Sequence, residues 1–202
     1  MNNTKLTLAL MAGLPAAGKT TIACALGRLL DWHIIDKDGH KLDLLKQGLD
    51  DWDASKAAYD WSFDTARDVL TKRQSSVILD SPALHSFIIE HAREIVNRIE
   101  NVQLKILLCV ADRDLRNHRL RSRSAQQLTI IRVDPVNIAD YFRCFNHLPP
   151  DSLKIYTNNP LEECIIQAKN YLIGKDFKNL TELDSSAFEF SAPSRVDHYI
   201  TT

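Results

Sequence analysis

Residues 6–26 read LTLALMAGLPAAGKTTIACAL, and this stretch decides which fold the chain is expected to adopt. Its centre, residues 13–20, satisfies the pattern G-x-x-x-x-G-K-[ST], which a chain of this length matches by chance on the order of one per cent of the time. The apolar run 6–12 predicts a strand buried on both faces. Apolar residues then recur at helical spacing, at Ile22, Leu26 and Leu29. This order of strand, glycine loop and helix lets backbone N–H groups and a helix dipole converge on an anion, so it predicts a phosphate-binding loop.

Each part of this loop has a physical task in holding a nucleotide. Gly13 and Gly18 let the backbone turn where a Cβ atom would clash. Lys19 can reach the β- and γ-phosphates of ATP, and the hydroxyl of Thr20 can ligate Mg²⁺. We expect the nucleotide to contact the whole loop, namely Gly13, Leu14, Pro15, Ala16, Ala17, Gly18, Lys19, Thr20 and Thr21.

The same stretch has an alternative interpretation as a secretory signal, because Lys5 precedes an apolar run that ends in small residues. That interpretation requires cleavage through the start of the helix and secretion of unpaired cysteines. The four cysteines lie far apart, with no C-x-x-C pair and no histidine at metal-ligand spacing. A reducing cytoplasm and the absence of a structural zinc site are therefore the favoured expectations.

Length and charge restrict the possible architectures and partners. The chain has 202 residues, of which 45% are hydrophobic, which predicts one globular domain at residues 1–174. Residues 175–202 lack periodicity and predict a loosely ordered tail. The 25 basic and 26 acidic side chains give a net charge of -1, so we expect neither a long nucleic acid nor a membrane as a partner.

Short apolar runs alternate with helical periodicity along the rest of the chain. Further strands are predicted at residues 33–36, 75–80, 103–111 and 153–157. The helix after the second strand is marked by leucines up to Leu49, and Ser81-Pro82 predicts an N-cap with proline at the first helical position. Gly174 predicts the end of the last helix. The alternation predicts an α/β fold: a five-stranded parallel sheet between two helical layers, as in the nucleotide-kinase-like P-loop NTPases.

Five segments in this order resemble the small P-loop kinases related to phage polynucleotide kinase, the zeta toxins and chloramphenicol phosphotransferase. The segments are GLPAAGKTT, IIDKDGHK, SVILDSP, LRNHRLRSR and IYTNNPLEEC, and the resemblance extends from Leu6 to Leu172. A GTPase is disfavoured because the base-reading N-K-x-D is missing. The chain departs from the family in having Ala16-Ala17 where a glycine or serine is usual, and Thr20 where serine is more frequent. Neither change removes a needed group.

In that family an aspartate after the second strand accepts the proton of the attacking hydroxyl. The resemblance places Asp38 at this position, preceded by Lys37 as is common in the family, and Lys41 where a basic residue often helps hold substrate. Asp36 competes as the catalytic residue, since Asp36 ends the strand whereas Asp38 is expected in the loop beyond it. Either aspartate could instead cap the next helix.

Asp80, at the end of the third strand, is expected to hold a Mg²⁺-bound water or the substrate, with helix capping as the alternative. Arginines are concentrated after the fourth strand, at Arg113, Arg116, Arg119, Arg121 and Arg123. Such a run alone is usually a solvated helix face. In the family's fold it coincides with a lid, here near residues 112–134.

Arg119 and Arg123 match the family's R-x-x-x-R and share one helical face. The resemblance implies that both neutralise charge on the transferred phosphoryl group, and Arg116 is a further candidate for this role. Arg119 is also expected to contact the nucleotide. Arg132 is a further lid candidate without a spacing argument.

The resemblance therefore implies an ATP-dependent, Mg²⁺-requiring phosphotransferase that acts on a hydroxyl of a small molecule, such as a metabolite, a nucleoside or nucleotide, or an antibiotic. A nucleotide-binding regulatory module or slow ATPase is the alternative. Polynucleotide 5′-ends are less favoured because the pI is 6.6. The acceptor is expected against residues 39–74 and 124–151. The aromatic side chains of the second segment could stack on it or belong to the core: Tyr141, Phe142, Phe145 and His147.

Overall fold

The computed structural model describes residues 5–122 and 143–174. The predicted tail at 175–202 and most of the predicted lid, with Arg123 and Arg132, lie outside these residues. Tyr141 and Phe142 of the predicted acceptor segment also lie outside them. Within the described parts, five parallel strands form one sheet in the order β2-β3-β1-β4-β5. The predicted α/β fold with a five-stranded parallel sheet is confirmed. The strands are β1 (Leu6–Ala12), β2 (His33–Asp36), β3 (Val77–Asp80), β4 (Val102–Val110) and β5 (Leu153–Tyr156).

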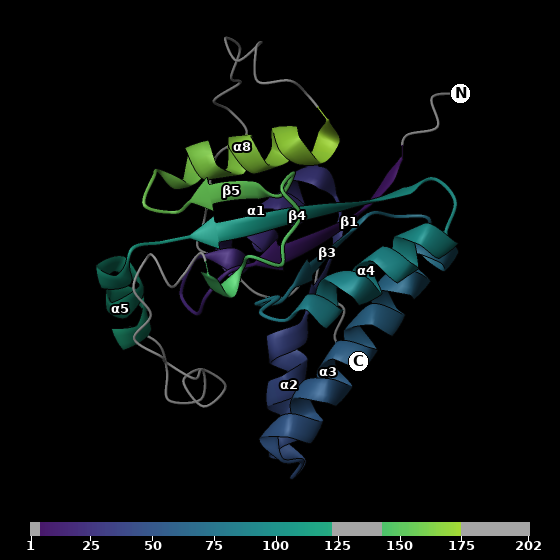
Figure 1. The fold of residues 1–202 in the computed structure, drawn as a ribbon, viewed down its shortest axis with the longest axis horizontal. Helices are drawn as coiled ribbons and strands as arrows, with labels where there is room; N and C mark the ends of the chain where they lie inside the picture. Colours follow the sequence, from purple (N-terminus) through teal and green to yellow (C-terminus); the bar gives the residue numbers. More distant parts are fainter. Residues whose placement is uncertain (1–4, 123–142, 175–202) are drawn as a thin grey trace.

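Helices cover both faces of this sheet (Figure 1). α1 and α8 pack on one face, and α3 and α4 pack on the other, while α2 lies beside α3 where both extend away from the sheet. A π-helical turn, η1 (Val69–Arg73), continues α3. The helices are α1 (Lys19–Leu30), α2 (Lys37–Lys46), α3 (Asp51–Asp68), α4 (Ser86–Arg98), α5 (Arg113–Arg121) and α8 (Leu161–Ile173).

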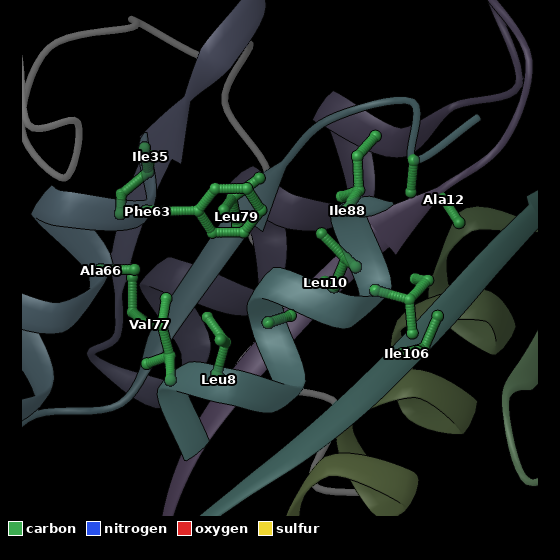
Figure 2. Close-up of a cluster of buried hydrophobic side chains, with 14 of the residues drawn as sticks. Leu8, Leu10, Ala12, Ile35, Phe63, Ala66, Val77, Leu79, Ile88 and Ile106 are labelled. Atoms are coloured by element: carbon green, nitrogen blue, oxygen red, sulfur yellow. The ribbon is translucent and has the colours of Figure 1, made fainter. Parts of the chain in front are cut away.

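The central strand β1 belongs to two hydrophobic cores because successive side chains of a strand point to opposite faces. Its residues Leu8, Leu10 and Ala12 face the α3 and α4 side, as Figure 2 shows. Ala9 and Met11 face α1 and α8. All five are completely buried, and each fully buried leucine stabilises the fold by about 1.5–3 kcal/mol, which fixes β1 and the loop that follows it. The partners in Figure 2 include Phe63, Ala66, Leu79, Ile88 and Ile106.

The strand order creates a switch point beside β1. After β1 the chain forms β2 and β3 on one side of it, and then crosses to form β4 and β5 on the other side. In open parallel sheets ligands bind at such a point, outside the carboxyl ends of the strands. The loops that follow β1, β3 and β4 all begin at this edge, so the fold itself indicates where a site belongs.

Three local predictions were wrong. α4 begins at Ser86, after an extended His85, and not at Ser81-Pro82. The carbonyl of Pro82 instead accepts a hydrogen bond from Gly13 N (3.1 Å), so the segment after β3 lies as a loop against the phosphate loop. α2 begins at Lys37 directly after β2, which places Asp38 in its first turn and not in a loop. α2 also ends at Lys46, before Leu49.

The other predicted elements match the structure closely. Gly174 ends α8 with φ of 69°, the left-handed conformation that glycine adopts readily.

No helix within residues 5–122 and 143–174 combines the length and the apolar character that a membrane crossing requires.

Candidate functional site

The phosphate loop joins the buried strand β1 to the helix α1. Gly13 (φ 138°) and Gly18 (φ 92°) both adopt conformations that L side chains rarely take. A Cβ atom on Gly18 would also lie 3.3 Å from Thr157 Cγ2, so the loop is tightly packed there. Gly18 is the N-cap of α1 and supplies no side-chain cap, which leaves the first N–H groups of the helix available to an anion. Ala16, one of the departures from the family pattern, has φ of 62° and is buried.

Lys19 lies inside the curve of this loop. Its ammonium donates hydrogen bonds to the carbonyls of Gly13 (2.9 Å) and Leu14 (3.2 Å), and the residue is buried. These contacts hold a positive charge within the loop. Thr20 and Thr21 follow at the exposed start of α1, and the hydroxyl of Thr20 donates a hydrogen bond to Asp80.

Asp36 and Asp80 are direct neighbours at the carboxyl edge of the sheet, because they are register partners on β2 and β3. Asp80 is buried, and its pKa is raised to about 7, chiefly by burial and also by the nearby Asp36 and Asp38 charges, while Lys19 and Thr20 oppose the rise. Asp80 does not cap α4, whose N-cap is His85 without a side-chain hydrogen bond. The capping alternative for Asp80 is therefore wrong.

Asp36 and Asp38, the two candidates for the catalytic carboxylate, make different contacts in the structure. Asp36 is the N-cap of α2, and its Oδ1 accepts a hydrogen bond from Gly39 N at 2.9 Å. A Cβ atom at position 39 would lie 2.6 Å from Asp36 Oδ2, so a larger residue there would require the Asp36 carboxylate to shift. Asp38 makes a different contact, since its Oδ1 accepts a hydrogen bond from Lys37 Nζ at 2.7 Å.

Asp38 is the half-exposed acid of the group, with 42% of its side chain accessible. Partial burial raises its pKa, but the ammonium groups of Lys37, Lys19 and Lys41 more than offset this effect, so the pKa lies below its usual range. Asp38 is thus ionised at neutral pH and close to the lysine of the phosphate loop.

Lys41, predicted to hold substrate, is buried and pairs with Asp51 Oδ1 at 2.7 Å. Because Asp51 is the first residue of α3, this ion pair connects the two helices.

The arginine segment forms the helix α5, from which Arg119 reaches the phosphate loop. Its Nη1 donates to Ala16 O (3.2 Å) and to Thr157 Oγ1 (3.0 Å), and its Nη2 donates to Thr157 O (2.9 Å). Arg119 therefore binds the loop backbone directly. Arg116 is buried in the same helix, whereas Arg123 lies outside the described residues.

Thr157 is a site residue that the sequence did not reveal. It follows β5, is buried, and donates a hydrogen bond from its hydroxyl to Ala17 O at 2.9 Å. Its position at the end of a predicted strand was the available signal, because the ends of all parallel strands meet at one edge.

Two of the aromatic residues that follow the predicted lid, Phe145 and His147, lie within the described part of the chain. Phe145 is buried in the core on the α3 and α4 side. His147 Nε2 lies 3.1 Å from the carbonyl of Ala83 in the loop after β3. These two side chains are part of the framework of the site.

The residues that could hold a divalent cation are oxygen ligands. Thr20 and Asp80 contact each other beside Lys19, and a hydroxyl and a carboxylate are ligand types that Mg²⁺ prefers. Among the described residues there is no cluster of three or more His, Cys, Asp or Glu that could hold a metal. Two protein ligands nevertheless suit Mg²⁺, which usually keeps several waters and binds substrate phosphates.

Comparisons with known proteins agree with this architecture. Three solved structures share the fold. A protein of Chloroflexus aurantiacus is 21% identical with a TM-score of 0.63, and the match covers 83% of this chain and 99% of that one. A sugar kinase from Janibacter sp. is 20% identical with a TM-score of 0.54 (85% of this chain and 96% of that one), and the APS kinase of Mycobacterium tuberculosis in complex with AMPPNP and APS is 15% identical with a TM-score of 0.59 (83% and 98%). No curated protein matches the chain significantly. The family model AAA_33, described as an AAA domain, matches residues 8–146, which is more than half of the sequence. The chain therefore belongs to the AAA_33 family of AAA domains.

Proposed function

We propose that this protein is an ATP-dependent kinase that transfers the γ-phosphoryl group to a hydroxyl of a small molecule. The observation that carries the proposal is the meeting of two kinds of group at one edge of the sheet. A phosphate loop with a buried lysine lies beside Asp38, a carboxylate kept ionised by that lysine and two others. A loop that binds phosphate and a base for the incoming hydroxyl are the two parts that phosphoryl transfer to an alcohol requires.

The nucleotide is held by the phosphate loop. In the proposed complex the N–H groups at the start of α1 bind the phosphates, and Lys19 turns from the carbonyls of Gly13 and Leu14 toward the β- and γ-phosphates. The fold is shared with an APS kinase whose structure contains AMPPNP, which supports nucleotide binding by this fold. Arg119 contributes by holding the backbone of Ala16 in place, and its charge lies close enough to the loop to favour phosphate.

Thr20 and Asp80 would hold Mg²⁺ in this proposal. When bound, the ion neutralises charge on the β- and γ-phosphate oxygens. The raised pKa of Asp80 fits this role, because a buried carboxylate among other acids gains most from a neighbouring divalent cation.

The chemical step follows from the position of Asp38. The acceptor oxygen forms a bond to the γ-phosphorus as the bond from that phosphorus to the β,γ-bridging oxygen breaks. The hydroxyl proton passes to the carboxylate of Asp38, and ADP leaves with the bridging oxygen. Asp36 is engaged as the cap of α2, which makes Asp38 the better candidate for this proton transfer.

Screening a metabolite library with ATP and Mg²⁺ tests the proposal, with detection by mass of any product heavier by one phosphate. A product formed by the wild-type protein and absent with Lys19→Ala and Asp38→Asn supports the kinase. Tight ATP binding without any phosphorylated product across the library would favour a nucleotide-binding regulatory module.

A further inference from the structure

The helix α2 buries only two of its residues, and both are lysines. Lys37 and Lys41 are 4% and 6% exposed, whereas the other residues of the helix are at least partly accessible. Lysine is rarely buried unless it is paired, since removing an ammonium group from water is costly. The pair with Asp51 explains Lys41, because it connects α2 to α3. Lys37 has a different surrounding.

The ammonium of Lys37 lies between a carboxylate and an aromatic ring. Its Nζ is 2.7 Å from Asp38 Oδ1 and 4.7 Å from the centroid of the Tyr59 ring. Tyr59 is buried, and its ring packs edge-to-face against Phe87 of α4 (5.9 Å) and beside Phe63 of α3 (6.2 Å). The ring is thus fixed by two helices, and a cation over its face is held in one place.

The contact between Lys37 and Asp38 is not an ordinary pair on a helix surface. Adjacent residues of a helix do not face each other, whereas residues three or four apart do. The ion pair between Lys46 and Asp43 at the end of the same helix has this usual spacing and is exposed. The Lys37 side chain must therefore turn back toward its neighbour, in a position that the Tyr59 ring stabilises.

We propose that Lys37 is a positioning residue that orients the carboxylate of Asp38 for the acceptor hydroxyl. Lys37 holds Oδ1, and Oδ2 is then presented to the acceptor. This inference rests on the proposed kinase function and assigns no substrate contact to Lys37 itself.

The charges around Asp38 agree with this role. Lys37 and Lys41 face it from α2, Lys19 faces it from α1, and the Tyr59 hydroxyl and Asp80 lie near it from α3 and β3. Lys37 has the largest effect among the cations that lower the pKa of Asp38, and it is the only one that donates it a hydrogen bond. Removing Lys37 leaves the effect of burial opposed only by the two remaining lysines.

Titration of Asp38 in the full chain, followed by ¹³C NMR of aspartate labelled at the side-chain carboxyl carbon, tests the inference without an acceptor. The Asp38 resonance is identified by its loss in Asp38→Asn. Lys37→Met should move the midpoint of the Asp38 titration to higher pH by about one unit or more, and Lys37→Arg should restore most of the wild-type value. The matched control is Lys46→Met, which removes an exposed ion pair of similar length from the same helix and should change nothing. An unchanged midpoint in a folded Lys37→Met protein overturns the inference.

Single-turnover transfer to an acceptor found in the screen gives the second readout. Lys37→Met should lower the rate by roughly tenfold or more and shift its acidic limb to higher pH, while ATP binding measured by calorimetry stays unchanged. A Lys37→Met protein that melts earlier but keeps the wild-type rate and acidic limb overturns the inference, since its role is then only structural. The kinase proposal fails separately, if the wild-type protein phosphorylates no acceptor although its Asp38 titration responds to Lys37.

Discussion

Replacing Asp36, the last residue of β2, and replacing Asp38, which lies in the first turn of α2, should have different consequences. Asp38→Asn keeps the shape of the side chain but removes the group that accepts the acceptor proton. Loss of a positioned base usually lowers the rate of the chemical step by roughly 10²-fold or more. ATP and Mg²⁺ binding should be kept, because the phosphate loop and the pair formed by Thr20 and Asp80 are unaltered.

Replacing Asp36 should lower the stability of the fold and leave the rate of phosphoryl transfer unchanged. Its Oδ1 caps α2 through Gly39 N at 2.9 Å, and loss of such a cap costs about 0.5–2 kcal/mol. For a protein of this size each kcal/mol lowers the Tm by about 2–4 °C. Asp36→Ala should therefore melt a few degrees lower, whereas Asp36→Asn should keep most of the stability, because asparagine caps about as well as aspartate.

Thermal melts and single-turnover transfer, measured on the same three variants, separate these effects. The acceptor is the product-forming compound of the metabolite screen, and rates are expressed per folded protein. A fully active Asp38→Asn would refute the assignment of the proton acceptor. Loss of transfer in Asp36→Asn with Asp38→Asn still active would show that the roles of the two aspartates are exchanged.

Four further predictions concern the nucleotide side of the site. Lys19→Ala should leave the fold intact but weaken ATP binding and abolish transfer, and unchanged affinity in isothermal titration would contradict the phosphate loop assignment. Thr157→Val should lower the free energy of unfolding by about 1–3 kcal/mol and weaken ATP binding, because the carbonyl of Ala17 and the guanidinium of Arg119 lose a buried partner. Urea melts measure this loss of stability, and Thr157→Ser is the control. The pKa of Asp80 rises from 3.8 to about 7 on folding, so between pH 4 and pH 7 the folded state binds a proton that the unfolded state has lost. The free energy of unfolding should therefore fall as the pH rises through this range, and Asp80→Asn should remove this pH dependence. Because Mg²⁺ competes with this proton, the increase in Tm caused by Mg²⁺ should be larger at pH 8 than at pH 6, and equal increases would contradict the metal assignment.

The sheet could be predicted because its signals are local. Each buried strand is a short apolar run. The run 6–12 is followed by a glycine loop whose sequence pattern has few interpretations other than a phosphate loop. Gly174 likewise marks a helix end by its own conformation. The sequence placed Asp36 and Asp80 at the ends of strands and Asp38 just beyond one, and the structure brings these positions to the carboxyl edge of the sheet.

The remaining parts depend on contacts distant in sequence. Ser81-Pro82 has the local features of a helix start, but the carbonyl of Pro82 accepts a hydrogen bond from Gly13 of the phosphate loop. No local pattern shows that the buried face of α2 consists of Lys37 and Lys41, since these lysines are buried by α3 and its Tyr59. Thr157 was overlooked for the same reason, because its partners Ala17 and Arg119 lie 140 and 38 residues away in the sequence.

The contacts of Thr157 have a consequence for the order in which the protein can become functional. Arg119 bonds to Ala16 across 103 residues, and Thr157 bonds to Ala17 across 140 residues. Contacts so distant in sequence form late, after the intervening chain has been ordered. During synthesis the phosphate loop is made before both partners, and Thr157 follows only after β5 has been made. A growing chain that ends before residue 157 should therefore carry the complete loop sequence and still bind ATP poorly, so that nucleotide binding marks the completion of the sheet.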